Sequence, residues 1–86
     1  MKRYVVLLWI YHKGGKTLSR RFTSKVFSDF DQAYKYGQKS AEIFRLVLKM
    51  SIGRVPVIVA EGDKFSIIDP SQSRLLCELV VSEIKL

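Results

Sequence analysis

Two adjacent glycines, Gly14 and Gly15, lie between two segments that have the side-chain patterns of β-strands. Glycine tolerates the positive φ angles of a two-residue type I′ turn, which matches the twist of paired antiparallel strands. The preceding segment, residues 4–11, is apolar at every position, so a strand there needs cover on both faces. The first 27 residues therefore predict a β-hairpin that supplies the centre of a sheet.

The second strand of this hairpin, residues 17–27, has one apolar and one polar side. Its apolar side carries Leu18, Phe22 and Val26. Its polar side carries Thr17, Ser19, Arg21, Thr23 and Lys25. Arg20 interrupts the apolar side, which predicts either a β-bulge or a position near the margin of the sheet, where the guanidinium reaches water.

Positive charge is concentrated in the same hairpin. The chain has a formal net charge of +7, and residues 1–27 contain seven basic residues and no acidic one. Residues 28–53 add +1 and residues 54–86 add −1, so the hairpin holds the whole excess. The candidate contacts to a polyanion are the cations at and after the turn, namely Lys13, Lys16, Arg20, Arg21 and Lys25.

Residues 28–52 have the pattern of a long amphipathic helix. Ser28 or Asp29 is a suitable N-cap, and Gly53 is suited to the left-handed position that ends a helix. Lys39 and Glu42 are expected to pair on the solvated face. The face predicted to pack on the sheet comprises Phe30, Ala33, Gly37, Ala41, Phe44 and Leu48, with Ile43, Val47 and Met50 widening it. Glycine costs helix stability relative to alanine, so Gly37 predicts a close approach to a strand.

The last third of the chain predicts further strands. Residues 55–60 and 65–69 are strand-like and flank a turn at 61–64, and Pro56 predicts an edge strand or the first residues of one. Residues 70–86 are ambiguous, because Asp69-Pro70-Ser71-Gln72 suits a helix start, whereas the alternating apolar side chains beyond it favour a strand. We favour the strand and keep the helix as the alternative. The predicted fold is a small α+β domain of order β-β-α-β-β-β, a mainly antiparallel twisted sheet with one long helix packed on one face.

Length and composition limit the class of protein. We expect residues 1–86 to form one domain, with room for one modest core but not for a large cleft, which favours a binding module over an enzyme. The single cysteine, Cys77, cannot form an intramolecular disulfide and fits a reducing cytoplasm. Met1-Lys2-Arg3 and the apolar run mimic a signal peptide, but the run is short and no small-residue cleavage pattern follows. No apolar run is long enough to span a membrane, so we expect a cytoplasmic protein.

The chain contains no complete catalytic, metal or cofactor motif. Gly15-Lys16-Thr17 copies the end of a P-loop, but Ile10 stands where the first glycine of that motif belongs. His12 is the only histidine, and no carboxylate near it in sequence can orient the ring as a general base. Cys77 alternates with leucines on an apolar face, which predicts a buried, inert thiol. One histidine and one cysteine are too few for a structural metal site, so no metal and no cofactor are expected.

The basic hairpin therefore carries the functional hypothesis. We expect a non-enzymatic module that binds DNA or RNA, because a solvated strand face with basic and hydroxyl side chains offers donors to phosphates. Trp9 or Tyr11 could stack on a base if exposed. The alternative is a protein-interaction or inhibitor module that docks an acidic partner through the same charges. A small ribonuclease using His12 beside Tyr11 and the strand arginines is a third hypothesis.

The apolar first strand also predicts self-association. One helix can cover only one face of the sheet. The other face would then carry Val5, Leu7, Trp9 and Tyr11, a larger apolar patch than soluble monomers usually expose. We therefore predict a homodimer through this sheet face or through an edge strand, unless a helical C-terminal segment covers the face.

Overall fold

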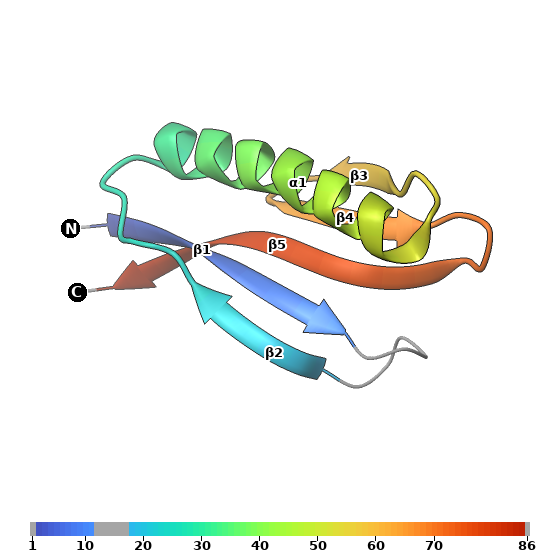
Figure 1. The fold of residues 1–86 in the computed structure, drawn as a ribbon. Coiled ribbons are helices and arrows are strands. Elements are labelled where there is room, and N and C mark those ends of the chain that lie inside the picture. The colour runs from blue at the N-terminus through green and yellow to red at the C-terminus, as the bar shows by residue number, and fades with distance from the viewer. Residues whose placement is uncertain (1, 12–17, 86) are drawn as a thin grey trace.

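The computed structural model describes residues 2–11 and 18–85, which form one helix and one five-stranded sheet (Figure 1). The strands are β1 (Lys2–Tyr11), β2 (Leu18–Thr23), β3 (Val57–Glu61), β4 (Lys64–Asp69) and β5 (Arg74–Lys85), and the helix is α1 (Phe30–Ile52). This order and the antiparallel pairing confirm the predicted α+β fold. The C-terminal segment is a strand, so the helical alternative is wrong.

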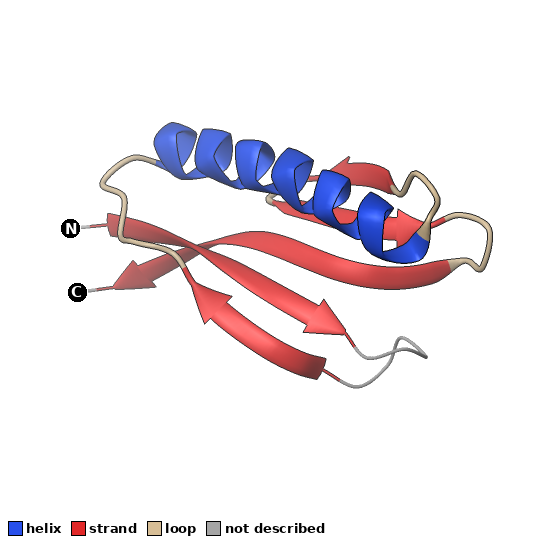
Figure 2. Ribbon diagram, in the orientation of Figure 1, coloured by secondary structure: helices blue, strands red, loops and turns tan. Residues whose placement is uncertain are grey.

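The strands lie in the order β2-β1-β5-β4-β3, and α1 runs along one face of the sheet (Figure 2). The prediction that the hairpin forms the centre of the sheet is only half right. β1 is an inner strand, but β2 is an edge, and the central place belongs to β5. β5 is the longest strand, with 12 residues, and it pairs with β1 on one side and with β4 on the other. Its apolar residues on both faces suit it to this position.

The hairpin strand β2 is shorter than predicted and ends at Thr23. Beyond it the chain stays beside β1: Ser24 donates its backbone N–H to the Val6 carbonyl at 2.9 Å, and its hydroxyl accepts the Val6 N–H at 2.8 Å. The pairing shifts register near the tip, where Ile10 pairs with Arg20 and Tyr11 with Leu18. The backbone at Arg20 thus lies both beside a register shift and on an edge strand, at the margin of the sheet.

The ends of α1 follow the sequence signals. Asp29 is the N-cap, and its carboxylate accepts the backbone N–H of Asp31 at 2.9 Å. Gly53 has a φ of 73° and donates its N–H to the Lys49 carbonyl at 2.9 Å, which closes the helix. On the solvated face the ion pair differs from the prediction, because Glu42 pairs with Arg45 at 3.2 Å.

Small residues bring α1 close to the sheet. Ala33, Gly37 and Ala41 are buried on the side of the helix that meets the sheet. A methyl group added at Gly37 would lie 3.2 Å from Cε2 of Phe65, so the predicted close approach to a strand is confirmed. The core beneath the helix contains Val6, Phe65, Ile67, Leu76, Cys77, Leu79 and Val81.

One part of the predicted helix face does not reach the sheet. Ile43, Val47 and Met50 are exposed, Met50 by 86% and Val47 by 53%. They recur with Tyr36 at spacings of three, four and seven, so they form a second stripe beside the buried one. The expectation that they widen the sheet-packed face is therefore wrong, because a helix meets a flat sheet along a narrow strip only.

The sheet face opposite α1 is less open than expected. Leu8 packs into the core on the helix side, so the alternate residues of β1 face the other way. Val5 is nevertheless buried, and Leu7, Trp9 and Tyr11 are half-buried. The homodimer stays a prediction, but the two most exposed large apolar side chains of the described residues, Met50 and Ile43, lie on α1 and not on this face of β1.

Candidate nucleic-acid interface

The basic candidate residues are distributed along and beyond the edge strand β2. Lys13 and Lys16 lie outside the described residues. For Arg20 and Arg21 the structure describes the backbone: Arg20 pairs with Ile10 and Arg21 with Trp9. Consecutive strand residues point to opposite faces of a sheet, so β2 offers one arginine position on each face. Both positions lie on an edge strand of the sheet.

Lys25 is the candidate whose side chain is described. It is exposed just beyond β2, and its ammonium lies 5.4 Å from the centre of the Phe27 ring. Phe27 contacts Tyr36 of α1, with ring centres 5.2 Å apart. The cation is therefore held over an aromatic surface that joins the hairpin to the helix, while its outer side remains open to an anion.

The aromatic side chains of β1 lie on the face opposite α1. The Tyr11 hydroxyl donates a hydrogen bond to the Glu78 carboxylate, and Lys64 Nζ lies 3.4 Å from the same carboxylate. These three residues form a polar row across β1, β5 and β4. Trp9 is paired with Glu78 in the strand register, so its indole is next to this row. Both aromatic residues are half-buried, which limits them to partial contact with a base.

The polar row is poorly suited to proton transfer at neutral pH. Burial raises the pKa of Tyr11 to about 12, and its hydrogen bond to Glu78 and the charge of Glu78 act in the same direction. A phenol with this pKa stays protonated and acts as a donor. The Tyr11 hydroxyl is engaged with the Glu78 carboxylate across the sheet, and the ribonuclease hypothesis stays a prediction. His12, its central residue, lies outside the described residues.

Cys77 is buried, as predicted, and takes part in the core. Burial raises the pKa of its thiol to about 12, with a smaller contribution from the neighbouring Glu78 charge. The thiol is therefore protonated and inaccessible, which excludes it as a nucleophile in the folded chain. Among residues 2–11 and 18–85, no group of three or more His, Cys, Asp or Glu could hold a metal ion.

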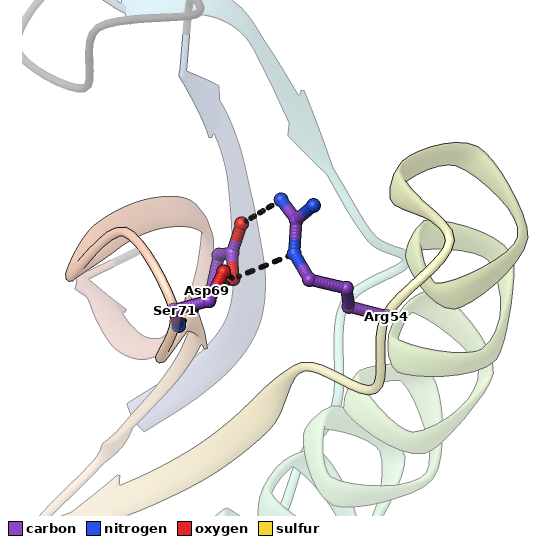
Figure 3. A network of polar contacts seen from close by, with 3 residues as sticks. All are labelled: Arg54, Asp69 and Ser71. Atoms are coloured by element: carbon purple, nitrogen blue, oxygen red, sulfur yellow. Dashed lines mark hydrogen bonds and ion pairs between the residues drawn. The ribbon is translucent and has the colours of Figure 1, made fainter.

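The most buried charge in the described structure was not predicted from the sequence. Asp69 is fully buried at the end of β4, and its carboxylate faces the guanidinium of Arg54, with N···O distances of 2.5 and 3.4 Å (Figure 3). The carboxylate also accepts the backbone N–H of Ser71 at 3.1 Å and its hydroxyl at 2.8 Å. The Asp-Pro-Ser sequence that resembles a helix start therefore forms the turn between β4 and β5, because the same aspartate chemistry caps turns and helices.

This network has a structural role. Arg54 follows the helix cap Gly53, so the ion pair joins the end of α1 to the turn that leads into the central strand. The hydrogen bonds from Arg54 lower the pKa of Asp69 to about 2, outweighing the opposing effect of burial. The acidic residue thus stays charged and fully engaged, and it offers no free carboxylate to a substrate.

Comparisons with known proteins give no relative from which a function could be inferred. No protein-family model, curated protein or solved structure matches the chain. The single described helix, α1, is too polar to cross a membrane.

Proposed function

We propose that the chain is a non-enzymatic nucleic-acid-binding module that contacts phosphates through its N-terminal hairpin. The observation that carries the proposal is the segregation of charge: the first 27 residues hold seven bases and no acid, whereas the rest of the chain is neutral overall. Nucleic-acid backbones are recognised mainly through such one-sided positive surfaces. The proposed contacts are Lys13, Lys16, Arg20, Arg21 and Lys25.

The position of β2 supports this proposal. β2 is an edge strand, so no further strand pairs with its outer side in the described structure. The most buried acid, Asp69, is paired with Arg54, and Glu78 is paired with Lys64, so neither carboxylate is left to repel a polyanion. The half-buried Trp9, opposite Arg21 in the register, provides an apolar surface next to the cations.

The proposal is tested by titrating labelled single-stranded and double-stranded DNA and RNA at several salt concentrations. Five phosphate contacts predict a log–log slope of affinity against salt of about −4.5 for duplex DNA, and about −3.5 for single strands. Affinity should then fall by about a hundredfold or more between 50 and 200 mM salt. Affinity no better than millimolar for all four ligands at low salt would contradict the proposal.

A charge-matched pair of variants separates the hairpin from net charge. The double variant Arg20→Gln and Arg21→Gln should reduce the magnitude of the salt slope by about 2, because each phosphate contact contributes about one unit. The control is Lys35→Gln with Lys49→Gln, which removes the same charge from exposed positions on α1. Equal weakening by both double variants would show that binding follows net charge and not the hairpin.

A second candidate function uses the same charges on a protein. A basic hairpin can dock an acidic partner, with charge raising the association rate more than the affinity. Pull-downs with and without nuclease treatment distinguish the two functions. Partners that are retained after complete nucleic-acid removal support protein docking, whereas partners that disappear support the nucleic-acid proposal.

A further inference from the structure

An apolar groove opens between α1 and the hairpin, on the helix side of the sheet. It has a volume of about 390 Å³. Its floor is formed by Leu8 and Ile10 of β1, and its two walls by Phe22 of β2 and by Tyr36 and Phe44 of α1. Phe22 and Tyr36 are each more than 40% exposed, so the groove is open to solvent along its rim. Its polar residues are few and small, namely Thr23, Ser24 and Ser40.

The groove exists because the helix is narrower than the sheet. Five strands at about 4.8 Å spacing extend about 19 Å, whereas one helix with its side chains is about 10 Å wide. Within the described residues α1 packs against β1, β5, β4 and β3 but does not contact β2. Figure 2 shows α1 running along the sheet, with β2 at the edge beyond it. The groove therefore lies over β2 and the adjoining part of β1 that carries Leu8 and Ile10.

The flank of α1 that borders this space is also apolar. The helical groove wall is made by Tyr36, Ser40 and Phe44. Ile43 and Val47 follow at spacings of three, four and seven from these residues, so they extend the same wall outward. Both are more than half exposed in the described structure. A helix lying in the groove would contact the sheet below and this stripe beside it, and would bury both surfaces at once.

The charges at the rim determine the kind of helix that fits. Lys39 is exposed beside Tyr36, and Lys25 is linked to the same tyrosine through Phe27. In the β1–β2 register Arg20 lies opposite Ile10, a residue of the groove floor. The acid on this side of α1, Glu42, is already paired with Arg45. A second copy of the chain would bring the same cations to its own stripe, so self-association there is opposed by like charges.

We propose that this groove binds an amphipathic helix of a partner protein that carries an apolar stripe flanked by acidic residues. The apolar stripe would lie over Leu8, Ile10 and Phe22, and the acids would face Lys39 and Lys25. This is the helix-in-groove mode of recognition, with anchor side chains at spacings of three, four and seven. The inference does not depend on nucleic-acid binding by the hairpin, because the apolar floor of the groove makes no use of phosphate chemistry.

The test uses three synthetic peptides of about 16 residues, enough for four helical turns. The first has leucines at spacings of three and four with glutamates on both flanks, the second has lysines in place of the glutamates, and the third is a shuffled version of the first without apolar periodicity. Calorimetry should give the first peptide a Kd on the order of 10 μM, at least tenfold tighter than either of the others. Equal binding of the shuffled acidic peptide would show that net charge alone explains the interaction, and it would overturn the proposal.

Two matched valines locate the site. Val47 and Val55 are 53% and 52% exposed, but Val47 lies on the exposed stripe of α1 beside the groove and Val55 precedes β3, the strand at the opposite edge from β2. Val47→Ser should weaken the first peptide at least fivefold, whereas Val55→Ser should leave its affinity within twofold. Both variants should retain the thermal unfolding temperature of the parent chain to within a few degrees, since surface substitutions have small effects. An unchanged affinity in Val47→Ser, or a chain dimer that Val47→Ser dissociates, would overturn the assignment of this surface to a partner helix.

Discussion

Arg54 lies 43% exposed with its guanidinium against the fully buried carboxylate of Asp69. The two partners are thus unequal: the arginine can be hydrated if it loses the aspartate, but the aspartate cannot be hydrated if it loses the arginine. The ion pair joins the segment after α1 to the turn between β4 and β5 (Figure 3). Its removal should therefore affect the stability of the fold and not ligand binding.

The first prediction follows from this asymmetry. Arg54→Ala leaves an unpaired buried charge, so it should lower the urea midpoint of unfolding more than the double variant Arg54→Ala with Asp69→Asn, which removes that charge. The double variant keeps an acceptor for Ser71, because asparagine retains one carbonyl oxygen. Urea titration of the parent and of both variants measures the order of their unfolding midpoints. A double variant less stable than Arg54→Ala would contradict it.

The same pair predicts a loss of stability in acid. The Arg54 hydrogen bonds lower the pKa of Asp69 from 3.8 to about 2 in the folded state, so the unfolded chain binds this proton first as the pH falls. The contribution of Asp69 is therefore present above about pH 4 and is lost between about pH 4 and pH 2. Unfolding free energies of the parent and Asp69→Asn should converge over this interval. A constant difference between them from pH 5 to pH 2 would disprove the linkage.

The close contact between Gly37 of α1 and the Phe65 ring gives a prediction about packing between the helix and the sheet. Gly37 is buried against this ring, which also contacts Tyr34 with ring centres 5.0 Å apart. Gly37→Val adds a branched side chain into this contact and should lower the free energy of unfolding by about 2 kcal/mol or more, because overpacking forces the core apart. Gln38→Val is the control, since it places the same side chain on the exposed face of α1. Chemical denaturation of both variants measures the difference, and equal losses would refute the close contact.

Local patterns in the sequence predicted the elements of this fold well. The Asp29 cap, the Gly53 terminus and the small-residue face of α1 are all features of a few neighbouring residues, and each has the expected place. The C-terminal segment was correctly predicted as a strand, because its partial alternation and its β-branched residues Val80, Val81 and Ile84 favour that conformation. Propensity and periodicity act over one or two turns, so they determine what each segment becomes.

Relationships between distant segments could not be predicted in the same way. Tyr11 and Glu78 are 67 residues apart, and their hydrogen bond depends on β5 lying beside β1 in one register. No single-segment pattern specifies that β5, rather than β1, takes the centre of the sheet. The apolar residues Ile43 and Val47 matched the helix period, but the period alone does not reveal how wide a strip the sheet can cover. The basic residues of the hairpin could be identified from the sequence alone. The apolar groove between the hairpin and α1 could be identified only from the structure.

The buried thiol gives a prediction about reactivity. Burial raises the pKa of Cys77 to about 12, so at pH 8 the folded chain contains almost no thiolate. Iodoacetamide should modify Cys77 in native buffer about a hundredfold or more slower than in 8 M urea, where exposure restores an ordinary thiol. Mass spectrometry at timed intervals measures both rates, with glutathione as the reagent control. Rapid modification of the native chain would mean that the core around Cys77 opens readily.

The last prediction concerns self-association through an edge strand. β3 pairs only with β4 in the described structure, and Val57 and Val59 are more than 40% exposed on it. A short apolar edge without a lysine is a template for pairing with another strand. We therefore predict a homodimer in which two β3 strands pair antiparallel across a twofold axis. Sedimentation equilibrium at micromolar concentration should give the dimer mass for the parent chain and the monomer mass for Val59→Lys, because two lysines would be brought together and desolvated at the new edge.

Val47→Ser is the control: it changes a valine of similar exposure on α1 and should leave the dimer intact. A parent chain of monomer mass would contradict the prediction, and a dimer insensitive to Val59→Lys would place the contact elsewhere.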